Sequence, residues 1–172
     1  RTSNGFKKEK TMRVLVSDVL GDIGVKMFQE AEGIEVDVKT GLSPEALKEI
    51  IGDYHALVIR SATRVTADLL EAATNLRVVG RAGIGLDNVD IPAATKKGIA
   101  VMNTPEGNVV TTAEHAIAMM LALSRNIPTG TTTMKEGLWE KKRLQGREIF
   151  NKVLGIIGFG KIGSIVADRA RG

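Results

Sequence analysis

The chain has 172 residues, of which 43% are hydrophobic and 26% charged, with a net charge of +4 and no cysteine. This length allows one domain, or one domain and a piece of another, and the composition is ordinary for a soluble globular protein. The lack of cysteine excludes disulfides and thiolate metal sites. Because no apolar run is long enough to span a membrane and the N-terminus has no signal peptide, we expect a cytoplasmic protein without a membrane partner.

The positive charge is concentrated at the N-terminus. Residues 1–13 contain five basic residues and one acidic residue, which leaves 19 of each sign in the rest of the chain. We therefore interpret residues 1–11 as a basic extension that precedes the first domain. The chain has only one Trp, one Tyr and four Phe, too few for a base-stacking surface, so no nucleic-acid partner is expected.

Short apolar runs alternate with helical patterns between residues 12 and 108. Strands are predicted at residues 12–17, 34–39, 56–59, 76–79 and 99–102. Helices are predicted between them, and two have clear start signals, Ser43 before Pro44 and Thr66 before the following helix. This alternation predicts an α/β domain, a flavodoxin-like doubly wound parallel sheet, over residues 12–108.

Polar and glycine residues follow the third, fourth and fifth predicted strands. They are Arg60, Ser61 and Arg64, then Gly83 and Ile84 in a glycine-rich turn, then Asn103. In a parallel sheet of this kind, ligands bind outside the carboxyl ends of the strands, so these residues are expected along one edge. Two arginines, a hydroxyl and free backbone amides suit a small anion that carries carboxylate or phosphate.

The pattern changes after residue 108. A long apolar helix is predicted at residues 113–123, a second helical stretch at residues 131–139, and a charged segment at residues 140–148. We interpret residues 109–152 as a helical segment between domains. A sixth strand is predicted at residues 153–157, at the start of a second domain.

The sixth predicted strand leads into a GxGxxG motif at residues 158–163, followed by a helix. In dinucleotide-binding domains such glycines form the turn, admit the pyrophosphate and pack helix against strand. The acidic residue that holds the ribose is expected about 20 residues further on. Residues 153–172 are therefore interpreted as only the first βα unit of a truncated Rossmann dinucleotide-binding domain.

Four segments, in this order, resemble the D-isomer-specific 2-hydroxyacid dehydrogenases. They are RSATRVTADLL, VVGRAGIGLDNVDIPAATKKGIAVMNTPEGN, TTAEHAIAMMLALSRNIP and LGIIGFGKIG. The resemblance implies an NAD-dependent oxidoreductase, present here as an N-terminal fragment with the substrate-binding domain, the interdomain helix and the start of the NAD domain.

The resemblance also implies roles for individual residues. Arg60, Ser61 and Arg64 match the residues that bind the substrate anion in the family. Gly83 and Ile84 match the turn that meets the substrate carboxylate and the nicotinamide, and Asn103 and Asn108 match the interdomain hinge. The residues that match the pyrophosphate contacts are Gly158, Gly160, Lys161, Ile162 and Gly163. Two arginines favour a phosphorylated hydroxy or keto acid as substrate. Another D-2-hydroxyacid dehydrogenase, or a non-enzymatic anion-binding module, remains an alternative.

The family's catalytic Arg, Glu and His are expected downstream of Gly172, so the chain alone is predicted to be inactive. Three lookalikes are rejected. We interpret His115 as structural within an apolar helix, His55 as a surface residue, and Arg171 as part of the helix after the GxGxxG motif.

Truncation has a physical consequence for the apolar helix at residues 113–123 and the strand at residues 153–157. Both are expected to expose apolar faces, which association usually covers. We therefore predict a homodimer, a domain-swapped pair, or a sixth strand folded back onto the first sheet.

Overall fold

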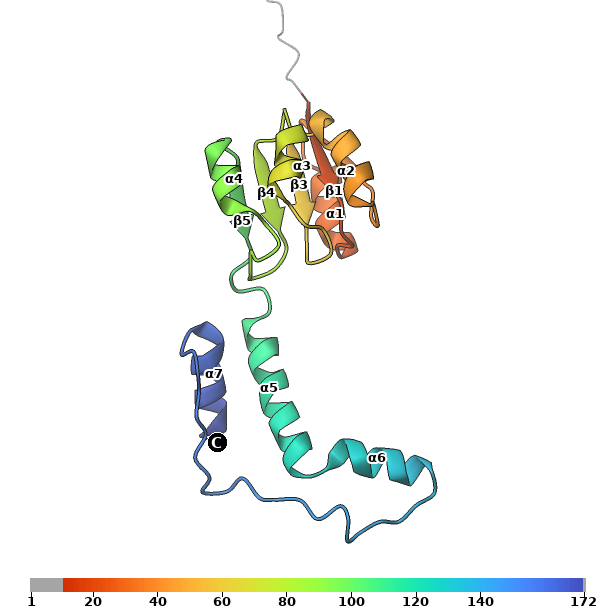
Figure 1. Cartoon of the computed structure of the whole chain (residues 1–172), viewed down its shortest axis with the longest axis vertical. Helices are drawn as coiled ribbons and strands as arrows, with labels where there is room; N and C mark the ends of the chain where they lie inside the picture. The colour runs from red at the N-terminus through yellow and green to blue at the C-terminus, as the bar shows by residue number, and fades with distance from the viewer. Residues whose placement is uncertain (1–10, 172) are drawn as a thin grey trace, which may run out of the picture. The chain divides into compact units, whose positions relative to one another are not determined.

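The structure is a computed structural model that describes residues 11–171, and it divides into two compact units, residues 1–107 and 108–172. The first unit is an α/β domain, and the second is helical (Figure 1). Of the predicted N-terminal extension, residues 1–10 lie outside the described residues.

One parallel sheet organises the first unit. Its five strands are β1 (Met12–Val16), β2 (Ile34–Val38), β3 (Ala56–Ile59), β4 (Val78–Arg81) and β5 (Ala100–Asn103), in the order β2-β1-β3-β4-β5. The predicted flavodoxin-like parallel sheet is confirmed. In this order the chain runs outward in opposite directions from β1 and β3, so the crevice between their carboxyl ends is the point where ligands bind in such sheets.

Short helices connect the strands. They are α1 (Asp22–Gln29), α2 (Pro44–Ile50), the 3₁₀ helix η1 (Ile51–Asp53), α3 (Ala67–Ala72) and α4 (Ile91–Lys96). The predicted caps are confirmed, since the Ser43 hydroxyl accepts from the Ala46 amide at 3.2 Å and the Thr66 hydroxyl accepts from the Leu69 amide at 3.3 Å. Each cap satisfies a donor that the first helical turn leaves unpaired.

A single hydrophobic core lies between the sheet and helices α2, α3 and α4 (Figure 1). Its members include Leu15, Leu57, Ile59 and Val79 from the strands and Leu47, Leu70 and Ala94 from the helices. Helix α1 packs along β2 and contributes no buried residue to this core. The core fixes the strands rigidly, so the loops at their carboxyl ends start from well-defined positions.

The second unit contains α5 (Val109–Ser124), α6 (Ile127–Lys135) and α7 (Lys161–Ala170). Helix α5 begins at Val109, four residues before its predicted start, and its buried residues are Val109 and Ala113. Helix α7 packs along α5, and Arg169 of α7 binds Glu114 of α5 at 2.7 Å.

Two predictions about the second unit are wrong. Helix α6 ends at Lys135 rather than residue 139, because Gly137 adopts a positive φ of 75° that a helix does not allow. Residues 153–157 form no strand, and Val153 and Ile157 are fully exposed. A strand needs a neighbouring strand for its backbone hydrogen bonds, and this segment has none within residues 11–171.

The predicted alternative in which this segment adds to the first sheet is therefore also wrong, because that sheet has five strands. Among the helices of residues 11–171, none combines the length and the apolar character needed to cross a bilayer.

Candidate functional site

The loop that follows β3, residues 60–64, is folded around a buried carboxylate. Asp18, which follows β1, accepts hydrogen bonds at Oδ2 from the amides of Arg60 (2.6 Å), Ala62 (3.2 Å) and Thr63 (3.1 Å). The Thr63 hydroxyl donates to Asp18 Oδ1 at 2.6 Å. Since Thr63 has a single hydroxyl proton, Ser17 donates its own to the Thr63 oxygen at 2.9 Å. Asp18 thus fills the crevice between β1 and β3 with an internal anion.

The hydrogen bonds decide the charge of Asp18. Burial by itself raises the pKa of this carboxyl, but the bonds from the Thr63 hydroxyl and the three loop amides outweigh burial and leave the pKa below its ordinary value. Asp18 is therefore ionised at neutral pH. The amides of Arg60, Ala62 and Thr63 are thus occupied by Asp18. The free amides expected along this edge are those of the glycine-rich turn, and there the Gly83 amide is not free, because it donates to the Arg81 oxygen at 3.0 Å.

The carbonyl side of the same loop is held by Asn88. Its Nδ2 donates to the Arg60 oxygen at 2.8 Å and to the Thr63 oxygen at 2.6 Å. Asn88 is buried, and its Oδ1 has no hydrogen-bond partner among the described residues. The loop is thus fixed on both sides by side chains that come from other elements.

The glycine-rich turn after β4 packs over a buried arginine. The Arg81 side chain is only 12% exposed, and it binds Asp87 Oδ1 at 3.0 Å and the Arg60 oxygen at 3.2 Å. A Cβ at Gly85 would lie 2.8 Å from Asp87 Oδ1 and 2.9 Å from Arg81 Nη1. Glycine at this position therefore allows the turn to close over the ion pair.

The end of β5 joins the same edge. Asn103 Nδ2 donates to the Ile84 oxygen at 2.7 Å, and the Thr104 amide donates to the Gly83 oxygen at 3.0 Å. Three loops that are far apart in sequence are thus linked by hydrogen bonds. The structure brings Arg60, Gly83, Ile84 and Asn103 together at the carboxyl edge of the sheet.

Two predicted anion-binding side chains remain available at this edge. Ser61 and Arg64 are exposed and make no hydrogen bond within residues 11–171. The Arg60 guanidinium is also exposed and donates to the Val19 oxygen at 3.2 Å. Asn108, the other predicted hinge residue, belongs to the second unit, where its carbonyl accepts from Thr112.

A cavity of about 440 Å³ opens next to this edge, between α2 and α3. Asp18, Thr63 and Arg64 line one wall, and Leu47 and Leu69 line another. Arg60, Ser61 and Gly83 do not line it, so the cavity and the predicted anion site share only part of loop 60–64. Residues 11–171 hold no cluster of three acidic or histidine side chains that could bind a metal ion.

The GxGxxG segment at residues 158–163 has the local shape that a pyrophosphate requires. Gly158 has a φ of 94°, and a Cβ at Gly163 would collide with the Gly158 carbonyl. Gly160 directly precedes α7, and a Cβ there would meet nothing within 4 Å. Lys161 and Ile162 form the first turn of α7. This open turn before a helix N-terminus fits the phosphates of a dinucleotide.

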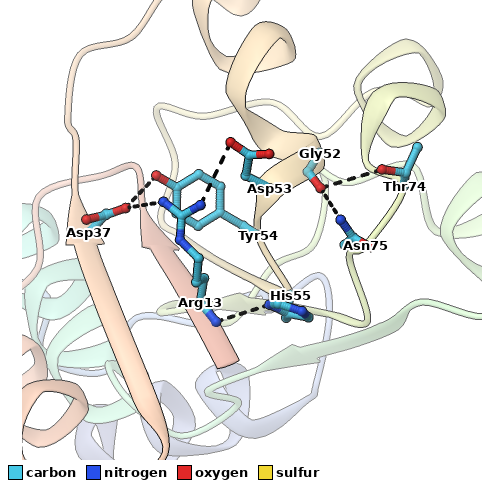
Figure 2. A network of polar contacts seen from close by, with 8 residues as sticks. All are labelled: Arg13, Asp37, Gly52, Asp53, Tyr54, His55, Thr74 and Asn75. Atoms are coloured by element: carbon cyan, nitrogen blue, oxygen red, sulfur yellow. Dashed lines mark hydrogen bonds and ion pairs between the residues drawn. The ribbon is translucent and has the colours of Figure 1, made fainter. Parts of the chain in front are cut away.

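Of the three rejected lookalikes, His55 requires a correction. His55 is half-buried rather than on the surface, because its Nδ1 accepts from the Arg13 amide at 3.1 Å (Figure 2). His115 is exposed on α5. Arg171 follows the last residue of α7, in the helical conformation expected.

Sequence reasoning missed three residues of this edge, namely Asp18, Arg81 and Asn88. Their partners lie at long sequence separations, up to 45 residues for Asp18 and Thr63. The available signal was position, since Asp18 directly follows the first strand and Asn88 lies in the glycine-rich turn.

Comparisons with known proteins point to one family. The family profile described as "D-isomer specific 2-hydroxyacid dehydrogenase, catalytic domain" matches residues 14–162. The D-3-phosphoglycerate dehydrogenase of Synechocystis sp. is 46% identical over 166 residues, which are 96% of this chain and 30% of that protein. The D-3-phosphoglycerate dehydrogenase of Homo sapiens is 50% identical over 157 residues, 91% of this chain and 29% of that protein. The chain thus spans about 30% of the length of these curated relatives.

Solved structures show the same fold. The TT0316 protein of Thermus thermophilus superposes with a TM-score of 0.85 at 33% identity, over 93% of this chain and 53% of that one. The NAD-dependent formate dehydrogenase of Staphylococcus aureus, in complex with NAD, gives a TM-score of 0.82 at 31% identity, over 92% and 53%.

Proposed function

Because the chain belongs to the D-isomer specific 2-hydroxyacid dehydrogenases, we propose that it is part of a D-3-phosphoglycerate dehydrogenase. Such an enzyme oxidises 3-phosphoglycerate to 3-phosphohydroxypyruvate with NAD, in the serine biosynthesis pathway. Identities of 46% and 50% to curated proteins of that name support this assignment over another D-2-hydroxyacid dehydrogenase.

The observation that carries the proposal is the hydrogen-bonded edge formed by loop 60–64, the Gly83–Ile84 turn and Asn103. It presents the guanidinium groups of Arg60 and Arg64 and the hydroxyl of Ser61 to solvent. 3-Phosphoglycerate carries a phosphate at one end and a carboxylate at the other. Arginines bind both groups with charge-assisted hydrogen bonds, so two arginines on one loop suit this doubly anionic substrate.

The backbone of the glycine-rich turn supplies the second part of the proposed substrate site. The amide of Ile84 donates no hydrogen bond within residues 11–171, whereas its carbonyl is fixed by Asn103. An amide held in this way can donate to a substrate carboxylate without further ordering. Ile84 also contributes the apolar side chain proposed to face the nicotinamide.

NAD supplies the hydride acceptor for this reaction when it is bound. Gly158, Gly160 and Gly163 are proposed to admit the pyrophosphate, with Lys161 and Ile162 at the N-terminus of α7. None of the residues 11–171 is assigned as the catalytic acid or base. We therefore expect no oxidation of 3-phosphoglycerate by this chain alone.

Thermal unfolding with added ligand tests the substrate site. A ligand that binds only the folded state raises the midpoint as its concentration exceeds Kd. 3-Phosphoglycerate should therefore stabilise the chain, and D-lactate at the same concentration should stabilise it less. Equal shifts with both ligands would refute a phosphorylated substrate, and no shift with 3-phosphoglycerate would refute a preformed site.

Arginine variants make the test specific. Arg64→Met should weaken 3-phosphoglycerate binding by roughly tenfold, since a charge-assisted hydrogen bond contributes about 1.5–3 kcal/mol. Arg77→Met is the matched control, because Arg77 is also exposed but directly precedes β4, at the amino-terminal ends of the strands. An equal loss in both variants would indicate general electrostatics rather than a site.

A further inference from the structure

Two buried side chains hold loop 60–64. One accepts hydrogen bonds from the loop amides, and the other donates hydrogen bonds to the loop carbonyls. Asp18 is an acceptor and binds the amides of Arg60, Ala62 and Thr63. Asn88 donates through Nδ2 to the carbonyls of Arg60 and Thr63. Three amides and two carbonyl oxygens of the loop are thereby occupied.

We propose that Asp18 and Asn88 are positioning residues that hold loop 60–64 in the conformation that binds the substrate anion. This inference rests on the proposed function, because it assigns the loop to the substrate. Neither residue is assigned a contact with the substrate. Both act through the loop whose Arg60, Ser61 and Arg64 side chains point to solvent.

Each residue matches the chemistry of the side that it holds. An ionised carboxylate only accepts, so it fits three amides and a hydroxyl, whereas an asparagine amide can donate twice to two carbonyls. Asn88→Asp reverses this match, because it places a negative charge against the two carbonyl oxygens. Asp18→Asn removes the negative charge that the three amides share at Oδ2, and the Thr63 hydroxyl then faces an NH₂ group to which it no longer donates.

Few other contacts fix the loop itself. Residues 60–64 belong to no helix or strand, and the side chains of Ser61 and Arg64 make no hydrogen bond within residues 11–171. Within the same residues, the loop backbone has one further polar contact, from Arg81 to the Arg60 oxygen, and the Arg60 and Thr63 side chains bond Val19 and Ser17. Without the Asp18–Asn88 pair, binding would have to order the loop, and that ordering reduces affinity.

The unpaired Oδ1 of Asn88 agrees with a role for its donor end. A buried polar atom without a partner destabilises the folded state and calls for an explanation. Turning the amide over would place Oδ1 against two carbonyl oxygens and lose both donated bonds. The observed orientation keeps both bonds to the loop and leaves Oδ1 unpaired.

Two measurements on the full chain test the inference. Amide hydrogen exchange by NMR reports whether loop 60–64 is ordered, without any ligand. Calorimetric titration with 3-phosphoglycerate reports affinity. Asp18→Asn and Asn88→Asp should each speed exchange of the Ala62 and Thr63 amides by at least roughly tenfold and leave the Leu57 and Val79 amides protected. Both should weaken 3-phosphoglycerate binding by roughly tenfold or more.

Matched controls make the same chemical changes outside the loop. Asn75→Asp removes a donor that binds the Gly52 oxygen at 2.6 Å, and Asp37→Asn removes a carboxylate whose partners are Arg13 and Tyr54 (Figure 2). These variants should lower thermal stability without changing loop exchange or affinity. If they weaken binding as much as the loop variants do, the role of Asp18 and Asn88 is merely structural and the inference is overturned.

A milder variant covers the case in which Asp18→Asn does not fold. Thr63→Val removes the hydroxyl bonds to Asp18 Oδ1 and to Ser17 but keeps the three amide bonds to Asp18, so it should speed loop exchange and weaken binding to a smaller degree. Unchanged exchange and affinity in Thr63→Val and Asn88→Asp would overturn the inference. Failure of the proposed function would look different, because the unmutated chain would then not bind 3-phosphoglycerate. The exchange measurements need no ligand and would still show whether Asp18 and Asn88 order the loop.

Discussion

Tyr54 is a fully buried aromatic residue whose hydroxyl contacts charged side chains (Figure 2). The hydroxyl donates to Asp37 Oδ2 at 2.6 Å, and Arg13 binds the same oxygen at 3.1 Å. The Arg13 guanidinium also lies 4.7 Å from the centre of the Tyr54 ring. The hydroxyl of Tyr54, followed by Arg13, holds the pKa of Asp37 below its ordinary value, against the opposing effect of burial.

Replacing Tyr54 by Phe should therefore destabilise the chain in a pH-dependent way. At pH 7 the loss of a hydrogen bond to a charged group should cost about 1–2 kcal/mol, within the usual range for partly exposed partners. A carboxyl with a lowered pKa stabilises the fold above its unfolded pKa, and that contribution is lost as pH falls through the folded pKa. Urea unfolding at pH 7 and at progressively acidic pH should show the difference between Tyr54→Phe and the original chain shrinking. A constant difference would attribute the loss to packing alone.

Gly85 provides a second test at the level of one residue. In Gly85→Ala the new Cβ would meet Asp87 Oδ1 and Arg81 Nη1 at less than 3 Å, so the ion pair beneath the turn must move. Because Asp87 is mostly exposed and can rotate away, we expect a moderate loss of about 1–2 kcal/mol. Gly80→Ala is the control, since a Cβ at Gly80 meets nothing within 4 Å. Thermal unfolding of the two variants should separate them, and equal midpoints would contradict the close approach at Gly85.

Helix α3 begins at a cap that links local sequence to the core. The Thr66 hydroxyl accepts from the Leu69 amide, and Leu69 and Leu70 are both buried against the sheet. Thr66→Ala should cost about 1 kcal/mol, the usual effect of removing an N-cap. Thr74→Ala should cost less, because the Thr74 hydroxyl lies 3.5 Å from the Gly52 oxygen, at the limit of a hydrogen bond. Chemical denaturation measures both, and a larger loss in Thr74→Ala would contradict the cap.

The caps also show which parts of the fold can be predicted from sequence. Ser43 and Thr66 act on amides three residues away, so their roles are readable from a few neighbouring letters. Parallel strands follow from periodicity, and the carboxyl-edge rule then places Arg60, Gly83 and Asn103 together. Asp18 and Asn88 escape such reasoning, because their partners are 25 to 45 residues away.

At residues 153–157 the sequence predicts an element that the structure does not contain. The run VLGII has the composition of a buried strand, but a strand forms only beside another strand that satisfies its backbone groups. No such strand pairs with it within residues 11–171. The predicted strand is therefore wrong for residues 153–157, because its formation depends on a partner that local sequence does not specify.

At the scale of the whole molecule, the second unit exposes many large apolar side chains. Helix α5 carries exposed Met119 and Leu123, and residues 153–157 add the fully exposed Val153 and Ile157. Large exposed apolar surfaces usually mark sites of association. We therefore expect the chain to form a homodimer or a domain-swapped pair through its second unit.

Sedimentation velocity tests the expected dimer, with a charged residue introduced into the segment 153–157. The original chain should sediment as a dimer at micromolar concentration, and Ile157→Lys should shift it toward monomer, because a lysine buried in an apolar interface costs desolvation energy. Val19→Lys is the control: Val19 is also exposed and apolar but lies in the first unit, so this variant should remain dimeric. If the original chain is a monomer in which the amides of residues 153–157 exchange freely, the second unit tolerates its exposed surface and association is refuted. If both lysine variants dissociate the dimer equally, the interface lies outside the second unit, or extends across both, and the exposed segment does not by itself explain association.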